Sequence, residues 1–102
     1  MSRTSKIRQS ARGEQCTVGV PHICNGDDET VVLAHLNGGG MGRKNPDYQA
    51  AYACSDCHEW LDGGFVRYDG TRDERDLLHY RAVLRTQARL IEKGLITVRG
   101  AA

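Results

Sequence analysis

Four cysteines constrain this chain more than any other feature, because they form two pairs that lie far apart in the sequence. Cys54 and Cys57 make a Cys-x-x-Cys motif, and Cys16 and Cys24 flank a turn that contains Pro21. Zinc in structural sites takes four ligands at tetrahedral corners, and thiolate sulfur suits it. We therefore expect the four cysteines to hold one structural Zn²⁺ ion.

The sequence leaves three alternative roles open for the cysteines. Some of them could be buried apolar residues, since an unpaired cysteine behaves as a small hydrophobe. A redox Cys-x-x-Cys motif would follow a βαβ pattern, which this sequence lacks, and it would leave Cys16 and Cys24 without a role. In the third alternative, His22 replaces one of the cysteines as a zinc ligand.

The length of 102 residues allows one small domain with a modest core. Aromatic residues make up only 6% of the chain, so a bound metal would supply stability that the core lacks. Structural zinc contributes about 10–16 kcal/mol of apparent binding energy that is coupled to folding. We expect one zinc-bound domain over residues 13–99, preceded by a basic arm over residues 1–12 that is flexible or forms a short amphipathic turn.

The middle of the chain contains signals for short elements. The β-branched and apolar residues 30–35 predict a strand that ends at His35. The glycine-rich residues 36–42 predict an irregular loop, open enough to admit a phosphate backbone. Residues 48–53 fit either the returning strand of a hairpin or the first turns of a helix. Residues 54–62 predict a short helix that ends at a pair of glycines.

Residues 73–93 give the clearest helix signal, with acidic residues in the first turn and Gly94 as the stop signal. Apolar side chains recur at three- and four-residue steps, which predicts one stripe facing the core. The stripe consists of Leu77, Tyr80, Leu84, Ala88 and Ile91. His79 lies beside it, and we expect a structural role for this histidine. Residues 95–98 predict a short final strand.

The formal charge of +1 gives no global basic field that would indicate a nucleic-acid partner. The distribution of charge says more, because residues 1–13 carry basic side chains and no acidic one. No apolar run is long enough for a transmembrane helix, and no apolar segment follows the basic N-terminus as in a secretory signal. We expect a cytoplasmic protein that does not contact membranes.

The order of these motifs resembles the HNH endonucleases, also called ββα-metal or His-Me finger nucleases. The resemblance rests on a strand ending in His35, a glycine-rich loop and the sequence Cys-x-x-Cys-His, with an upstream cysteine pair that completes a zinc site in many members. A narrower resemblance, to the nuclease family of lambdoid phages and prophages (YbcO-like), extends over nearly the whole chain. Its shared segments are Ala11-Arg12-Gly13, Cys24-Asn25-Gly26, Ala34-His35 and residues 53–58.

The resemblance implies an α+β fold, namely a small zinc-stabilised ββα-metal finger, treble-clef-like, with an added long C-terminal helix. The ββα core would cover about residues 14–62, and the helix about residues 73–93. A phage or prophage would encode such a protein.

The resemblance also implies an activity, the metal-dependent hydrolysis of DNA phosphodiester bonds. His35 corresponds to the general base that activates water, and His58 corresponds to a ligand of the catalytic ion, Mg²⁺ or another divalent cation. The asparagine of the HNH motif falls on Gln49, and Asp47 could supply the orienting or metal-binding group instead. Ala34 stands where many family members have a metal-binding aspartate.

Each of these residues also fits a simpler role. His35 could be a buried, hydrogen-bonded histidine, His58 a surface residue and Asp47 an acid in a turn. The departures at Ala34 and Gln49 favour a second class of function, a non-catalytic zinc finger that binds nucleic acid or a protein.

DNA is the partner that the nuclease hypothesis requires. Contacts to phosphates give affinity without sequence information, and basic side chains make them. The candidate phosphate contacts are Arg3, Lys6, Arg8, Arg12, Arg43 and Lys44. A third hypothesis is a homodimer formed through the long C-terminal helix.

Overall fold

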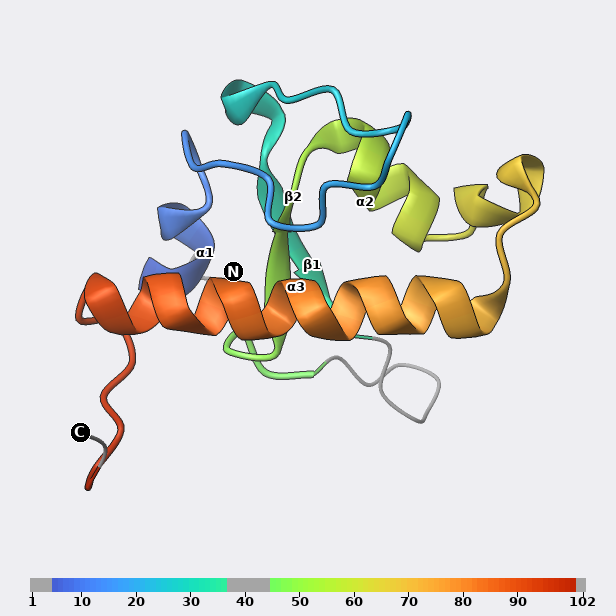
Figure 1. The fold of residues 1–102 in the computed structure, drawn as a ribbon. Coiled ribbons are helices and arrows are strands. Elements are labelled where there is room, and N and C mark those ends of the chain that lie inside the picture. The colour runs from blue at the N-terminus through green and yellow to red at the C-terminus, as the bar shows by residue number, and fades with distance from the viewer. Residues whose placement is uncertain (1–4, 37–44, 101–102) are drawn as a thin grey trace.

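The computed structural model describes residues 5–36 and 45–100 of the chain. At its centre lies a two-stranded antiparallel hairpin of β1 (Val32–His35) and β2 (Ala50–Ala53). The long helix α3 (Arg72–Glu92) crosses this hairpin, as Figure 1 shows. The shorter elements are α1 (Lys6–Ser10), α2 (Ser55–Leu61) and two 3-10 helices, η1 (Asp28–Thr30) and η2 (Gly64–Tyr68).

The hairpin resolves the ambiguity over residues 48–53 in favour of the returning strand. In its register Val32 pairs with Ala53 and His35 pairs with Ala50. All four residues of β2 are buried, so this strand lacks the alternation of apolar and polar residues that marks a half-exposed strand. Three of them are alanines, whose small side chains let a helix approach the sheet closely.

Helix α2 starts directly after β2 and confirms the short helix expected over residues 54–62. Cys54 caps its N-terminus, and the Cys54 sulfur accepts a hydrogen bond from the backbone N–H of Cys57 at 3.4 Å. The helix ends at Leu61, before Gly63, whose φ of 139° favours glycine. Its buried residues include Trp60, which packs edge-on against Phe65 with ring centroids 5.9 Å apart.

Helix α3 corresponds to the helix expected over residues 73–93. A capping box starts it: the Thr71 side chain accepts from the Glu74 backbone, and the Glu74 side chain accepts from the Thr71 backbone. Among the described helices, none is long and apolar enough to cross a membrane.

The expected orientation of α3 is wrong, because the apolar stripe faces away from the core. Leu84, at its centre, is 67% exposed, and Leu77, Tyr80 and Ile91 are exposed as well. The buried face consists of His79, Ala82, Val83, Thr86 and Leu90. This face combines apolar side chains with two polar ones that bond the backbone of the hairpin; the Thr86 hydroxyl, for example, accepts the backbone N–H of Tyr52 at 3.1 Å.

The final strand expected over residues 95–98 is also absent among the described residues. Gly94 adopts a φ of 73° and ends α3. The backbone N–H groups of Leu95 and Ile96 then donate to the carbonyl of Leu90 at 2.9 and 3.3 Å. The segment therefore caps the helix instead of pairing with the hairpin.

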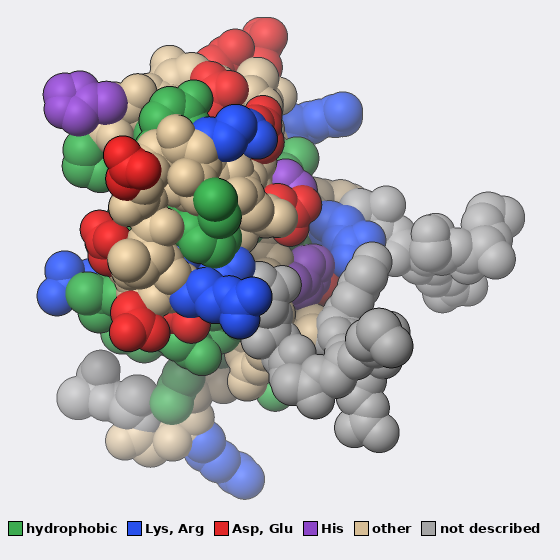
Figure 2. Space-filling model, turned by 90° about the vertical axis from the view of Figure 1, so that its right-hand side faces the viewer, with side chains coloured by type: hydrophobic (Ala, Val, Ile, Leu, Met, Phe, Trp, Pro, Cys, Tyr) green, Lys and Arg blue, Asp and Glu red, His purple; other side chains and the backbone are tan. Residues whose placement is uncertain are grey.

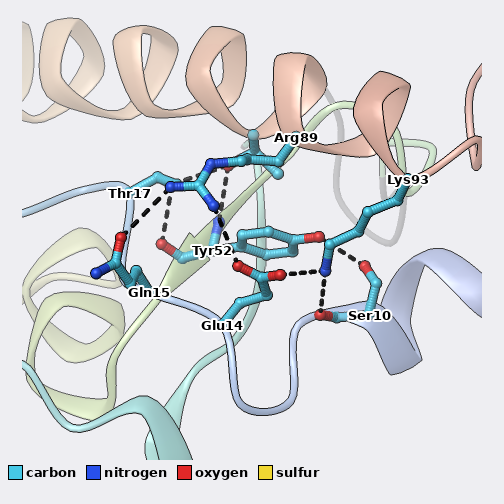
Figure 3. A network of polar contacts seen from close by, with 8 residues as sticks. Ser10, Glu14, Gln15, Thr17, Tyr52, Arg89 and Lys93 are labelled. Carbon is cyan, nitrogen blue, oxygen red and sulfur yellow. Dashed lines mark hydrogen bonds and ion pairs between the residues drawn. The ribbon is translucent and has the colours of Figure 1, made fainter.

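The basic N-terminal segment contains the short helix α1, and Ala11 after it is 1% exposed. Figure 3 shows how the C-terminal part of α3 holds this segment. Lys93 pairs with Glu14, and its ammonium group lies 5.6 Å from the centroid of the Tyr52 ring. Tyr52 in turn hydrogen-bonds the Ser10 hydroxyl at 2.7 Å. The C-terminal end of α1 therefore contacts β2 and the end of α3.

Candidate functional site

The four cysteines come together at the end of the hairpin where α2 begins. Their Sγ atoms all lie within 4.8 Å of one another, and those of Cys24 and Cys54 are 3.8 Å apart. A tetrahedral ion with Zn–S bonds of about 2.3 Å places its sulfurs about 3.8 Å apart. The cluster therefore has the donor set and the spacing that a zinc ion requires. His22 is exposed and is not part of this cluster.

The upstream cysteines reach the cluster through a tight turn. The backbone N–H of Cys24 donates to the carbonyl of Val20 at 2.9 Å, which closes the turn. His22 within the turn has a φ of 65°, a conformation that few residues other than glycine adopt. The Asn25 side chain then donates to Ser55 and Asp56 of α2 at 3.0 and 3.1 Å. These bonds fix the turn against the first residues of α2.

The electrostatics of the cluster favour a cation. The hydrogen bond from Cys57 lowers the pKa of Cys16 to about 4. The same contact, together with burial, raises the pKa of Cys57, and burial raises the pKa of Cys24. The ionised Cys16 also raises the pKa of Cys24 and of Cys57, and a bound cation would counter this effect, because zinc binds cysteine as thiolate.

A histidine–carboxylate pair lies at the opposite end of the hairpin. His35 is the last residue of β1, and its Nε2 lies 2.7 Å from Oδ1 of Asp47, in the turn that precedes β2. Two residues near the N-terminus also contact this carboxylate: Ser5 donates its hydroxyl to Oδ2, and the Arg8 guanidinium lies 3.6 Å from Oδ1. The Ser5 hydrogen bond, followed by that of His35, lowers the pKa of Asp47.

Ala34, immediately before His35, is 4% exposed, and its carbonyl accepts a 2.8 Å hydrogen bond from His79 of α3. His79 is itself buried, and this burial lowers its pKa. The structural role expected for His79 agrees with this contact, which ties β1 to α3.

His58 lies on α2 and is half-buried. Burial is the main cause that lowers the pKa of His79 on α3, and His58 contributes in the same direction. Figure 2 shows histidine side chains on one face of the molecule, next to lysine, arginine and acidic side chains.

The remaining expected site residues have different positions. The Gln49 side chain accepts a 3.0 Å hydrogen bond from Asn45, so Asp47 is the residue that contacts His35. Lys6 and Arg12 are exposed on the segment that contains α1. Arg3, Arg43 and Lys44 lie outside the described residues, as do the glycines of residues 38–42.

Ser5 was not among the residues expected at this site. A serine followed by a basic, partly apolar segment is a signal for a helix N-cap, and the backbone N–H of Arg8 does donate to the Ser5 hydroxyl at 3.0 Å. No sequence pattern connects this residue to a carboxylate 42 positions away.

Comparison with known proteins gives consistent matches. A protein-family model described as "Putative nuclease YbcO" matches residues 5–95. Two curated relatives are "Putative nuclease YbcO" of Escherichia coli (strain K12) and "Putative nuclease ybcO" of Enterobacteria phage 82. Each is 48% identical over 59 residues, which cover 55% of this chain and 62% of the relative, less than two thirds of its length.

A solved structure has a similar fold. It is described as "Structure of a putative bacteriophage protein from Escherichia coli str. K-12 substr. MG1655" and aligns with a TM-score of 0.72 at 36% sequence identity. The alignment covers 87% of this chain and 100% of that chain. The fold of this chain is therefore similar to that of an experimentally determined protein.

Proposed function

Because the chain belongs to the family described as "Putative nuclease YbcO", we propose that it is a metal-dependent, HNH-like endonuclease that hydrolyses DNA phosphodiester bonds. The contact between His35 and Asp47 is the observation that carries this proposal. The contact lies at one end of the unit formed by β1, β2 and α2. The four cysteines lie at the other end of this unit. A phage or prophage origin fits the relatives.

His35 acts as the general base in this proposal. The ionised Asp47 carboxylate can only accept hydrogen bonds, so the Nε2 atom of a neutral His35 carries the proton that Asp47 accepts. The lone pair of that imidazole is then on Nδ1, where it can take a proton from an attacking water. A neutral imidazole is suited to this step near neutral pH.

His58 is the proposed protein ligand of the catalytic divalent ion, Mg²⁺ or another. When bound, such an ion would stabilise the charge that develops on the phosphate. Among the described residues, only the four cysteines form a group of three or more potential metal ligands. The catalytic ion would therefore take most of its ligands from water and phosphate oxygens, as Mg²⁺ commonly does.

The cysteine cluster is the proposed structural zinc site. The distances between its sulfurs fit zinc, and two of its members, Cys54 and Cys57, are fully buried. Four protein ligands leave no open position for substrate, so the zinc would hold the fold together and take no part in hydrolysis. With zinc bound to the four cysteines, the hairpin and α2 would form a treble-clef-like finger.

DNA would bind through phosphate contacts. Lys6 on α1 and Arg12 just after it are exposed, and Arg8 of the same helix lies next to the carboxylate that contacts His35. Arg3, Arg43 and Lys44 complete the proposed set of basic contacts. Phosphate contacts of this kind position the backbone and read no bases, so we expect weak sequence preference.

Plasmid cleavage tests the proposal. Zinc-loaded protein, incubated with supercoiled plasmid and Mg²⁺ or Mn²⁺, is expected to nick or linearise it, and His35→Ala is expected to abolish this while retaining zinc. His22→Asn is the matched control, since it removes an exposed histidine and asparagine tolerates the positive φ at this position. Equal cleavage by wild type and His35→Ala would refute the role of His35.

One observation favours a non-catalytic zinc finger as the second candidate. The position of the metal-binding aspartate in many HNH enzymes is occupied here by Ala34, which is buried and has no side-chain donor. In that case the protein would bind DNA with ordinary salt dependence, and no divalent ion would produce cleavage.

A further inference from the structure

The Asp47 carboxylate is held from two directions. His35 uses Oδ1, at 2.7 Å from its Nε2, whereas Ser5 donates to Oδ2. The Arg8 guanidinium lies 3.6 Å from Oδ1 and adds a positive charge on the same side. With a partner on each oxygen, the carboxylate cannot rotate without losing a hydrogen bond.

We propose that Ser5 and Arg8 are positioning residues, which fix the Asp47 carboxylate against His35 and so make the N-terminal helix α1 part of the active site. The inference rests on the proposed nuclease function. It assigns to the N-terminal basic segment a role besides phosphate binding.

The structure also fixes α1 at its other end. The Ser10 hydroxyl donates to the carbonyl of Ile7 at 2.6 Å, so the Tyr52 hydroxyl is the donor in its 2.7 Å bond to Ser10. Lys93, the C-cap of α3, donates to the Ser10 carbonyl at 3.4 Å. These contacts attach the C-terminal end of α1 to β2 and to the end of α3 (Figure 3), separately from the contacts of Ser5 and Arg8 with Asp47.

The chemical consequence concerns the His35 ring. Hydrogen bonds to an ionised carboxylate are stronger than bonds between neutral groups, and Ser5 supplies one of them. A carboxylate held in this way keeps the proton of His35 on Nε2 and leaves Nδ1 free to accept one. Without Ser5 and Arg8, Asp47 can turn towards water, and the His35 ring then populates both tautomers.

The first experiment observes the tautomer directly in the zinc-loaded full chain. Long-range ¹H–¹⁵N NMR spectra, recorded above the ordinary pKa of imidazole, report which nitrogen of His35 carries the proton. We expect the Nε2–H form in the wild type and a mixture of tautomers in Ser5→Gly. Glycine keeps most of the N-cap preference, so this variant removes the hydroxyl with little loss of helix stability.

Two further variants separate positioning from simple structural support. Ser5→Thr keeps a hydroxyl and a good N-cap, so it is expected to restore the Nε2–H form. Ser10→Ala makes the matched change at the other end of α1 and is expected to leave the His35 tautomer unchanged. An unchanged tautomer in Ser5→Gly, or the same mixture in Ser10→Ala, would overturn the proposal.

Cleavage kinetics provide the second readout. Ser5→Gly is expected to lower kcat by about tenfold with an unchanged KM, as for the loss of one charge-assisted hydrogen bond. Arg8→Ala is expected to lower kcat as well, whereas Lys6→Ala, which removes the same charge from the same helix, is expected to raise KM only. If Arg8→Ala also changes KM alone, Arg8 is a phosphate contact and not a positioning residue.

The two readouts distinguish the inference from the function on which it rests. The tautomer measurement needs no cleavage, so a wild-type protein that shows the Nε2–H form but cuts no DNA would contradict the nuclease proposal only. A protein that cuts DNA while Ser5→Gly leaves both kcat and the tautomer unchanged would contradict this inference only.

Discussion

The two ends of the hairpin are built in different ways. At the end where β2 leads into α2, four cysteines gather, and local turns close around them. At the other end, His35 contacts Asp47, which Ser5 and Arg8 of the N-terminal segment also contact, so three separate parts of the chain meet there. Because β1 has only four residues, these ends lie roughly 10 Å apart.

The difference indicates that the cysteine end contributes to the stability of the fold and the histidine end to the proposed catalysis. In the proposed zinc site at the cysteine end, two ligands are fully buried and no position is left for a substrate, so its contribution would be to the fold. The histidine end is partly exposed, with 17% of the His35 side chain and 24% of the Asp47 side chain accessible, so a substrate can reach it. Changes at the two ends should therefore affect different measurements.

The largest effect is expected at the cysteine end. Cys54→Ser should release zinc and unfold the domain, since zinc binding of about 10–16 kcal/mol is coupled to folding. Circular dichroism and a colorimetric zinc assay measure the two losses. Ser55→Ala, the adjacent change, should keep both the fold and the metal. A folded, zinc-free Cys54→Ser protein would show that the core suffices without the metal.

The hairpin between the two ends depends on α3. Leu90→Ala should lower the free energy of unfolding by about 2–5 kcal/mol, because Leu90 is 0% exposed. Leu84→Ala makes the same chemical change at a 67% exposed position of the same helix and should cost about 0.5 kcal/mol or less. Urea unfolding measures both values.

The Leu84 variant also tests the homodimer hypothesis. If a second copy covered the exposed stripe, Leu84→Ala would lower stability in a manner that depends on protein concentration. Sedimentation analysis of the wild type and of Leu84→Glu would then show a dimer and a monomer.

At the histidine end, Asp47→Ala should leave zinc content unchanged and lower the rate of plasmid cleavage by about 10²-fold, at the lower end of what general acid–base groups contribute. The reason is that His35 loses the acceptor that orients its ring. Plasmid cleavage and zinc content, assayed on one preparation, check both statements. Loss of zinc in this variant would mean that the two ends are coupled through the hairpin.

The smallest effect concerns pH. Burial places the pKa of His79 in the folded protein below the ordinary 6.5, so the unfolded chain binds more protons as the pH falls below that value. Stability from this group is therefore complete above about pH 6.5 and declines below it. The charged or titratable groups around His79 are Arg75, Asp76 and His58.

His79→Gln keeps an N–H donor for the Ala34 carbonyl but does not titrate. Urea unfolding over a pH series should thus show a shallower acid slope for this variant than for the wild type. Because both proteins have the same zinc site, any acid release of zinc affects them equally. Parallel slopes would show that His79 does not titrate between the two states.

Much of the local structure was predictable from the sequence. Short-range signals predicted α2, α3 and the strand that ends at His35, because capping residues, glycines and β-branched runs act within a few positions. The strand over residues 50–53 was ambiguous, since burial on both faces removes the alternation that identifies a strand. The orientation of α3 was mispredicted, because Leu84 and Leu90 are equally apolar in sequence. Only the packing of α3 against the hairpin determines which of the two leucines is buried.

The sequence alone determined the cysteine cluster, because four residues of one uncommon type in two pairs have few uses in a small domain. It also marked His35 and His58 as candidates. Only the tertiary structure decided that Asp47 rather than Gln49 contacts His35, and that Ser5 and Arg8 hold Asp47. Candidate metal ligands can be recognised from residue type and spacing. A hydrogen-bond partner 42 residues away is determined by tertiary packing, which no local sequence pattern predicts.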